Sequence, residues 1–274
     1  MTVVVKIGGA KAVDPAGAVG DIADLVGNGE PVGVVHGGST AVDDLLDRLD
    51  IEPTYVETPN GVVGRFTDEA TMEAFTMAMG RVNTDLVAAF REVGVDAVGL
   101  SGVDGGLITG PRKSAVRVLE DGKKKIKRGD HSGKIESVNA ELLEALLEDG
   151  YTPVAGPPML ADDGVPVNTD ADRAAAAVAG ALGATLVILT DVAGVYADPD
   201  DPETLIESVT TPAEYDALTD AAEGFMTKKV MAATEALERG ASEVIVAEAN
   251  ADAPVTAALG ESGTHIHQSA LENI

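Results

Sequence analysis

The sequence contains no cysteine and no tryptophan, and aromatic residues make up only 3% of its 274 residues. Without cysteine the chain can form no disulfide and can use no thiolate as a nucleophile or a metal ligand. It also has no apolar run long enough to cross a membrane and no signal peptide. We therefore expect a cytoplasmic protein that does not bind membranes.

Basic residues are scarce as well: 19 lysines and arginines stand against 46 aspartates and glutamates, which gives a formal net charge of −27. A surface this negative repels the phosphates of nucleic acid. Self-repulsion at such a net charge destabilises the compact chain when salt is removed, and halophilic proteins exploit high net charge. The composition predicts a protein from a high-salt cytoplasm that is least stable at low salt.

The few basic residues are unevenly placed. Residues 111–134 hold nine of the 19, beside three acidic residues. Alternation over residues 115–119, followed by Glu120-Asp121-Gly122, predicts a β-hairpin here. A charge run is usually a solvated face, but a basic island on an acidic chain indicates a docking surface for an acidic partner. The predicted docking residues are Arg112, Lys113, Arg117, Lys123, Lys124, Lys125, Lys127 and Arg128.

Strand and helix patterns alternate along the whole chain. We expect strands over residues 3–7, 32–35, 96–100, 152–155, 185–190 and 243–246, and helices over 14–27, 137–148, 171–182 and 227–239. Another long helix should start near Thr67, a second hairpin should span 159–167, residues 191–202 should form a loop, and a last strand should lie near His265. Such alternation predicts an α/β fold with a mostly parallel sheet and helices on both faces.

Two glycine turns end predicted strands. Residues 3–7 run into Gly8-Gly9, and residues 32–35 run into His36-Gly37-Gly38. A helical pattern follows each turn, so backbone N–H groups at the helix N-terminus can face an anion. The spacing of about thirty residues fits two neighbouring parallel strands that open into one cleft.

Two segments of the chain carry lysines that need an explanation. Lys6 lies inside an apolar strand pattern, where it either has a partner or reaches water from an edge strand. Lys228 and Lys229 fall near the start of a helix, where the dipole disfavours cations. There they either meet an anion or point into water.

Polar residues also gather at two predicted helix and strand ends. Residues 168–173, with Asp170 and Asp172, precede an alanine-rich helix, and an aspartate N-cap alone would explain them. The segment 190–196 leaves a buried strand for a long loop, a natural edge for a nucleotide. Glycine turns, lysines and a carboxylate to hold those lysines indicate phosphoryl transfer. The four histidines are scattered, and we assign His265 and His267 structural roles.

These motifs, in this order, resemble the amino-acid kinase family over essentially the full length. The matching segments are residues 6–9, 36–38, 64–65, 168–172, 190–196 and 229–230. The resemblance implies a three-layer α/β/α sandwich forming one domain over residues 1–274. It also implies a lobe of about residues 1–160 for the acyl substrate and a dimer contact, and a lobe of 161–274 for ATP.

The resemblance further implies roles for individual residues. Lys6 and Lys229 would stabilise the transferring phosphoryl group, and Asp172 would orient both lysines. The residues implied for the substrate are Gly37, Gly38, Arg65 and Asn168, and those for ATP are Gly8, Gly9, Thr190, Asp191 and Tyr196. Mg²⁺ would arrive with ATP, with no metal site of the protein's own. An acceptor carboxylate is ionised at pH 7, so positioning and charge neutralisation replace a general base.

Within the family the chain most resembles kinases that act on glutamate or 2-aminoadipate attached to an acidic amino-group carrier protein of the LysW type, in arginine or lysine biosynthesis. The basic segment and residues 129–133 favour this reading, because free acetylglutamate needs no cationic patch. Ser39 replaces a frequent third glycine and Asp170 a frequent asparagine. N-acetylglutamate kinase is the main alternative. A non-catalytic nucleotide sensor is a remote one, since it would not need the two lysines and Asp172.

Overall fold

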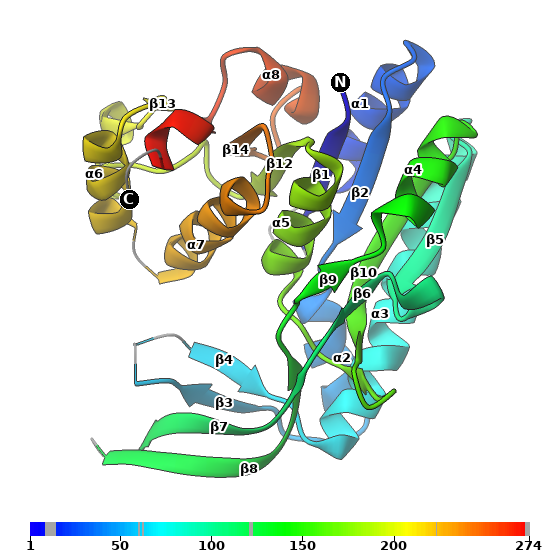
Figure 1. Cartoon of the computed structure of the whole chain (residues 1–274), viewed down its shortest axis with the longest axis vertical. Helices are drawn as coiled ribbons and strands as arrows, with labels where there is room; N and C mark the ends of the chain where they lie inside the picture. The colour runs from blue at the N-terminus through cyan, green and yellow to red at the C-terminus, as the bar shows by residue number, and fades with distance from the viewer. Residues whose placement is uncertain (9–14, 60, 62, 121–122, 223, 272–274) are drawn as a thin grey trace.

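A computed structural model describes the whole chain except residues 9–14, 60, 62, 121–122, 223 and 272–274 (Figure 1). Most of its strands belong to one large sheet that runs through the molecule. They are β1 (Val3–Ile7), β2 (Val32–His36), β5 (Ala97–Gly102), β6 (Ile108–Gly110), β9 (Ser137–Val138), β10 (Thr152–Ala161), β11 (Pro166–Val167), β12 (Thr185–Thr190), β13 (Ser208–Val209), β14 (Glu243–Glu248) and β15 (Thr264–His267). Among the described residues no helix is long and apolar enough to span a membrane.

The sheet has the strand order β13-β15-β14-β12-β1-β2-β10-β6-β9, with β5 and β11 also paired to β10. Its pairs are parallel except β14–β15, β6–β9 and β10–β11. Strands β1, β2 and β12 are buried along their whole length, as expected for β-branched and apolar segments at the centre of a parallel sheet. The predicted mostly parallel sheet is confirmed.

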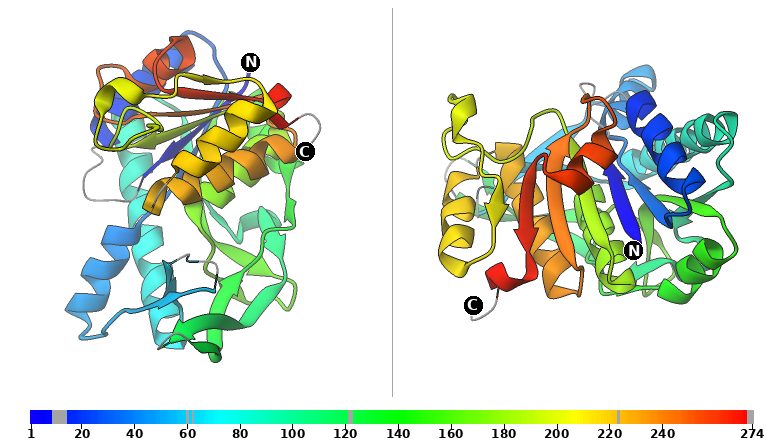
Figure 2. Two further views of the ribbon diagram at one scale, coloured as in Figure 1. Left: turned by 90° about the vertical axis from the view of Figure 1, so that its left-hand side faces the viewer. Right: turned by 90° about the horizontal axis from the view of Figure 1, so that it is seen from above.

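Helices cover both faces of the sheet (Figure 2). They are α1 (Pro15–Gly27), α2 (Ser39–Arg48), α3 (Glu69–Glu92), α4 (Ala140–Glu148), α5 (Ala171–Leu182), α6 (Pro212–Ala221), α7 (Gly224–Glu238) and α8 (Pro254–Gly260), with short 3-10 helices at Asp104–Gly106, Pro202–Thr204 and Gln268–Leu271. Alternate β12 side chains show the layering: Leu186 and Ile188 pack with α4, α5 and α7, while Val187 and Leu189 pack with α1, α3 and α8. The three-layer α/β/α sandwich is therefore confirmed.

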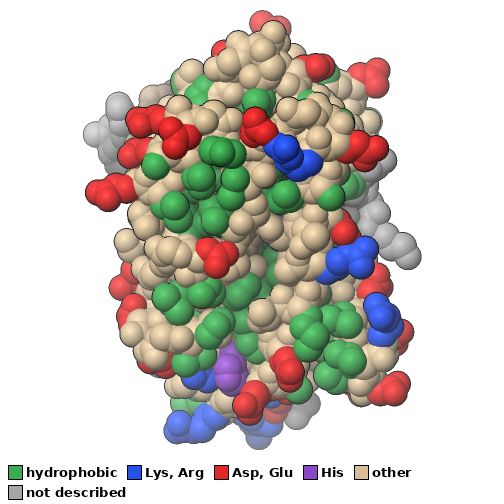
Figure 3. All heavy atoms as spheres, turned by 90° about the vertical axis from the view of Figure 1, so that its right-hand side faces the viewer, with side chains coloured by type: hydrophobic (Ala, Val, Ile, Leu, Met, Phe, Trp, Pro, Cys, Tyr) green, Lys and Arg blue, Asp and Glu red, His purple; other side chains and the backbone are tan. Residues whose placement is uncertain are grey.

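Two small antiparallel sheets lie at one end of the molecule, below the large sheet in Figure 1. One consists of β3 (Thr54–Glu57) and β4 (Val63–Phe66), and the other of β7 (Arg112–Glu120) and β8 (Lys123–Gly133). The second confirms the predicted basic hairpin, although its turn at Asp121 and Gly122 lies outside the described residues. On the side of α3, α4 and β5, acidic side chains are spread over the surface and several lysines and arginines gather at the lower end (Figure 3).

Several predicted boundaries were wrong. Residues 137–148 were expected to form one helix, but Ser137 and Val138 belong to β9, and Asn139 caps α4 through its side chain. Helix α6, which begins with a capping box between Thr211 and Glu214, was not predicted. Strand β10 continues to Ala161 and pairs with β11, which confirms the second hairpin and lengthens the strand.

Candidate active site

The carboxyl ends of three adjacent parallel strands meet at one edge of the large sheet. Lys6 of β1 lies opposite Val35 of β2 in the ladder, and β12 pairs with β1 on its other side. Gly8, Gly37 and Asp191, which follow these strands, therefore leave the sheet at the same edge. This is the edge at which open parallel sheets bind ligands.

Three charged side chains come together at this edge. Lys6 Nζ lies 2.6 Å from Asp172 Oδ1, and Lys229 Nζ lies 3.4 Å from Asp172 Oδ2. The three side chains are 7%, 11% and 13% exposed for Lys6, Asp172 and Lys229 respectively. Because β1 is a central strand, the alternative of a lysine that reaches water from an edge strand is wrong.

Helix α5 holds Asp172 in place through its N-terminal turn. The Asp170 side chain accepts hydrogen bonds from the backbone N–H groups of Asp172 (2.9 Å) and Arg173 (3.2 Å). Asp170 is thus the N-cap considered from the sequence. Asp172 lies in the first turn, where the helix dipole favours a carboxylate. The cap therefore fixes the backbone of the residue that both lysines contact.

Electrostatics keep this cluster charged. Burial acts to raise the pKa of the Asp172 carboxyl, but the ammonium groups of Lys6 and Lys229 outweigh it and lower that pKa to about 2. Burial and the charge of Lys6 lower the pKa of Lys229, and Asp172 opposes them. With both lysines protonated, the cluster carries one net positive charge, the sign that attracts a phosphoryl group.

The two glycine turns lie beside the cluster of Lys6, Asp172 and Lys229, and Gly37 and Gly38 have different roles in the structure. The Gly37 N–H donates to Ile7 O (3.0 Å), which extends the ladder between β1 and β2. Gly38 is the N-cap of α2, and a Cβ there would lie 2.6 Å from Met79 Sδ. Gly38 therefore lets α3 pack against the turn, in addition to the substrate contact that the resemblance implies for it. Gly8 follows β1, and Gly9 lies outside the described residues.

A buried polar network under the second turn was not predicted. His36 is 1% exposed, and burial lowers its pKa. Asn83 Nδ2 lies 3.0 Å from His36 Nε2 and also donates to Val154 O at 2.8 Å. A Cβ on Gly156 would come within 2.5 Å of the His36 ring. The network joins β2, α3 and β10 next to the glycine turn, and no local sequence pattern pairs His36 with Asn83.

Arg65, which we expect to contact the substrate, is anchored to α2. Its Nη2 lies 2.5 Å from Asp43 Oδ1 and 3.2 Å from Ser39 O, and the guanidinium lies over the Tyr55 ring at 5.7 Å. Its buried Nε has no hydrogen-bond partner among the described residues. These contacts fix the guanidinium against α2.

Asn168 takes part in a junction of three segments. Its Nδ2 donates to Thr67 Oγ1 (2.9 Å), and the backbone N–H of Thr67 donates to Asp130 Oδ1 (3.3 Å). Asp130 is 1% exposed and also accepts from Ser132 Oγ. The junction joins the start of α3, the basic hairpin and the segment before α5. Thr67, which Asn168 contacts, follows Arg65 by two residues.

The residues expected to contact ATP lie on β12 and the loop that follows it. Thr190 is buried and ends β12, and its Oγ1 donates to Asp191 Oδ1 at 3.1 Å. Asp191 is exposed at the same edge as Lys6. Tyr196 lies farther along the loop and pairs with Leu205 through an isolated bridge. The described contacts link none of these three directly to Lys6 or Lys229.

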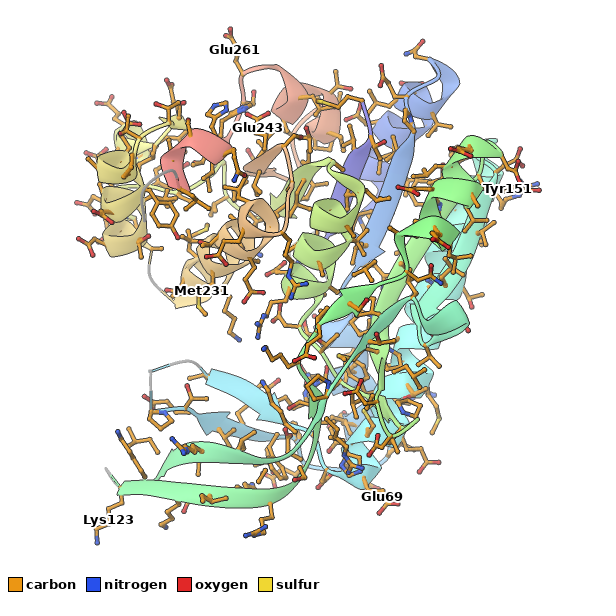
Figure 4. All side chains as sticks on the ribbon, in the orientation of Figure 1. Glu69, Lys123, Tyr151, Met231, Glu243 and Glu261 are labelled. Atoms are coloured by element: carbon orange, nitrogen blue, oxygen red, sulfur yellow. The ribbon has the colours of Figure 1, made fainter. Side chains whose placement is uncertain are left out.

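The eight predicted docking residues divide between two faces of the β7–β8 hairpin. In the register Arg117 lies opposite Ile126 and Ala115 opposite Arg128, so these side chains share one face with Lys124. We call Arg117, Lys124, Ile126 and Arg128 the outer face. All four are exposed, and Ile126 is 65% exposed. Lys123 marks the tip of the hairpin, away from the large sheet (Figure 4).

The other docking residues are partly engaged within the chain. Lys127 lies over the Phe66 ring at 4.3 Å, and Lys125 Nζ lies 2.6 Å from Glu120 Oε2. Arg112 Nη1 lies 4.0 Å from Asp163 Oδ2. Lys113 and Lys123 are exposed. The outer face is thus the part of the basic segment that presents cations around an exposed apolar side chain.

Comparisons with known proteins agree with this geometry. Residues 1–248 match the amino acid kinase family. The chain is 41% identical to the "[LysW]-aminoadipate kinase" of Deinococcus radiodurans, covering 96% of this chain and 90% of that one, and 42% identical to the "Acetylglutamate kinase" of Methanopyrus kandleri, covering 89% and 93%.

A solved structure of N-acetylglutamate synthase from Neisseria gonorrhoeae, complexed with coenzyme A and N-acetyl-glutamate, aligns with a TM-score of 0.76 and 26% identity. The alignment covers 97% of this chain but 59% of that longer protein. Among the described residues, no group of three or more histidines, aspartates and glutamates could hold a metal ion. The chain belongs to the amino acid kinase family.

Proposed function

We propose that this chain is an ATP-dependent kinase that phosphorylates the side-chain carboxylate of glutamate or 2-aminoadipate attached to an acidic carrier protein of the LysW type. The observation that carries the kinase assignment is the buried carboxylate of Asp172 between Lys6 and Lys229. It lies at the edge of the sheet where the two glycine turns end. The family match supports ATP as the phosphoryl donor.

In the proposed reaction, a carboxylate oxygen of the acceptor attacks the γ-phosphorus of ATP. The new O–P bond forms an acyl phosphate, and the bond to the β–γ bridging oxygen breaks to release ADP. Lys6 and Lys229 offset the charge that develops on the phosphoryl oxygens, and Asp172 holds both ammonium groups in place. Mg²⁺ bound to ATP adds charge neutralisation. Because the acceptor is already ionised, the chain needs no general base.

The remaining site residues extend this proposal. Arg65 and Asn168 would bind the acceptor, beside the turn at Gly37 and Gly38, in which the Gly37 N–H is already engaged with Ile7 O. Gly8, Gly9, Thr190, Asp191 and Tyr196 would bind ATP. In this assignment, residues of about 1–160 form the acceptor lobe and residues 161–274 the ATP lobe.

The choice between a carrier-bound and a free acceptor rests on the basic hairpin. The two relatives described above carry different names at similar identity, so the identity between these chains alone does not separate the two functions. Free acetylglutamate has no surface large enough to use the outer face of the hairpin. An acidic carrier would pair with Arg117, Lys124 and Arg128 and would cover the exposed side chain of Ile126.

The test is ATP turnover in molar KCl with either glutamate-loaded carrier or free N-acetylglutamate. We expect turnover with the glutamate-loaded carrier and none with free N-acetylglutamate. The double variant Arg117→Glu with Arg128→Glu should raise KM for the carrier by at least about tenfold. The outer face of the hairpin would then repel the acidic carrier instead of attracting it. Arg48→Glu is the control, since it reverses a charge at an exposed site elsewhere.

Other outcomes would separate the alternatives. Turnover with free N-acetylglutamate would identify an acetylglutamate kinase and leave the outer face without this role. ATP binding without turnover on either acceptor would favour a sensor. A 2-aminoadipate-loaded carrier, assayed in parallel, decides between the two side chains, which differ by one methylene. We also propose that the chain forms a homodimer in a high-salt cytoplasm. Sedimentation in KCl tests whether the dimer forms.

A further inference from the structure

One hydrogen bond crosses between parts of the chain that are far apart in sequence. Lys228 Nζ donates to the backbone carbonyl of Val63 at 2.6 Å, and the two residues are 165 positions apart. Lys228 lies on α7, and Val63 is the first residue of β4. The small β3–β4 sheet is separate from the large sheet, and α7 lies above it in Figure 1. The bond therefore links the β3–β4 sheet to α7, a helix of the proposed ATP lobe.

The bond between Lys228 and Val63 lies next to two residues of the candidate site. Lys228 immediately precedes Lys229, which contacts Asp172 at 3.4 Å. Val63 lies two residues before Arg65 on the same short strand, and Arg65 is fixed at its other end to Asp43. The bond thus joins the helix that carries one site residue to the strand that carries another.

The lysine at this position also differs from an ordinary surface lysine. It lies in the second turn of α7, and its side chain reaches a backbone carbonyl of a different element. A backbone carbonyl is an acceptor that no substitution of Val63 removes, so the contact depends on the reach and donor capacity of Lys228 alone. A charged donor forms a stronger hydrogen bond than a neutral one.

We propose that Lys228 is a positioning residue whose bond to Val63 sets the spacing between β4 and α7, and hence between Arg65 and Lys229. The inference rests on the proposed function for its kinetic consequence, because only a shared acceptor makes that spacing matter. Lys228 touches no reacting atom in this assignment. It acts through the two elements that it joins.

The first measurement does not depend on activity. Because the chain has no cysteine, Glu57→Cys on β3 and Met231→Cys on α7 can carry spin labels at two exposed positions. Pulsed electron paramagnetic resonance should give a narrow distance distribution with Lys228 present. Lys228→Met, which keeps the length but removes the donor, should broaden or lengthen it, and Lys228→Arg should restore it.

The second measurement is kinetic, on the full chain without labels. Lys228→Met should lower kcat/KM for the acceptor by about tenfold, with rescue by Lys228→Arg and an unchanged melting temperature. Arg48→Met, at an exposed helix position, is the control for loss of one cation.

The two measurements distinguish a failure of the proposed function from a failure of the inference about Lys228. If no acceptor is turned over by the unmodified chain, the proposed function fails and the distance distributions still decide whether Lys228 sets the spacing. An unchanged distribution in Lys228→Met overturns the inference, whatever the kinetics. A widened distribution with unchanged kcat/KM also overturns it, because the spacing would then not affect catalysis.

Discussion

Asp172 meets two ammonium groups with the two oxygens of one carboxylate, at 2.6 and 3.4 Å. Burying three charges is costly, and the ion pairs offset that cost only while all three groups remain charged. The pKa of Asp172, lowered to about 2, keeps its charge over the whole physiological range. Lys229 is the weaker member, because burial and Lys6 lower its pKa.

Lys229 therefore gives a prediction at the scale of one residue. Lys229→Met should reduce kcat by about 10²–10³-fold, while ATP binding changes little, because the ammonium acts on the transferring group. Since the pKa of Lys229 is lowered, wild-type activity should fall on the alkaline side below the ordinary lysine value of 10.5.

Lys229→Arg tests the charge itself. An arginine stays protonated at alkaline pH, so the residual activity of this variant should persist to higher pH than that of the wild type. Profiles of kcat against pH for both proteins check this expectation. Full turnover by Lys229→Met would remove Lys229 from the mechanism.

At the residue scale, the sequence indicated which charged side chains gather at the sheet edge better than it indicated the contacts of the other candidate residues. Lys6 was singled out because a lysine inside an apolar strand needs a partner, and Asp172 is that partner. The roles of Asp43, Asn83 and Asp130 were not predicted, because each contact joins segments that only the tertiary fold brings together. Local periodicity carries no signal for such contacts.

At the scale of elements, the β14–β15 pair contains a titrating contact outside the candidate site. His265 Nδ1 lies 2.9 Å from Glu243 Oε1, and His267 Nδ1 lies 3.6 Å from the same oxygen. The hydrogen bond with Glu243 raises the pKa of His265, against the effect of burial. The structural role assigned to these histidines remains a prediction that stability measurements can test.

The sign of the pH effect follows from that raised pKa. His265 contributes its full stabilisation below its unfolded pKa of about 6.5, and the contribution is lost as the pH rises through the higher folded value. Urea unfolding should therefore show a loss of up to about 1 kcal/mol between pH 6 and pH 8.5 that His265→Gln abolishes.

His131→Gln is the control for loss of one imidazole elsewhere, since the His131 ring contacts a backbone carbonyl and lies outside the β14–β15 pair. An identical pH dependence in wild type and His265→Gln would show that the pair of strands does not depend on this contact.

Elements with a strong period were predictable and short ones were not. In α3, Met72, Phe75, Met79 and Leu86 recur at helical spacing and are buried, and Val82, which shares that spacing, is partly buried. Strands such as β9 and β13 have two residues each, too few to show any period, and are defined only by their partners. The wrong start of α4 has the same cause, because β9 occupies the positions assigned to its first turn.

At the scale of the whole molecule, the net charge of −27 predicts a dependence on salt. Screening of like charges should raise the melting temperature by roughly 10 °C between 0.1 M and 2 M KCl, with most of the rise at low concentration. Calorimetry at a series of KCl concentrations measures this. Sucrose, which does not screen charge, is the control, and a melting temperature highest at low salt would contradict the prediction.

The position of the basic hairpin gives the molecule a large electric dipole, with its positive end at β7 and β8 and its negative end over the α/β sandwich. In dilute buffer this dipole would turn an approaching acidic protein before contact and speed association. At 1 M salt the field decays within about 3 Å, less than the length of one lysine side chain. Orientation would then act only after collision, and direct ion pairs around Ile126 would select the partner by residence time rather than by arrival rate.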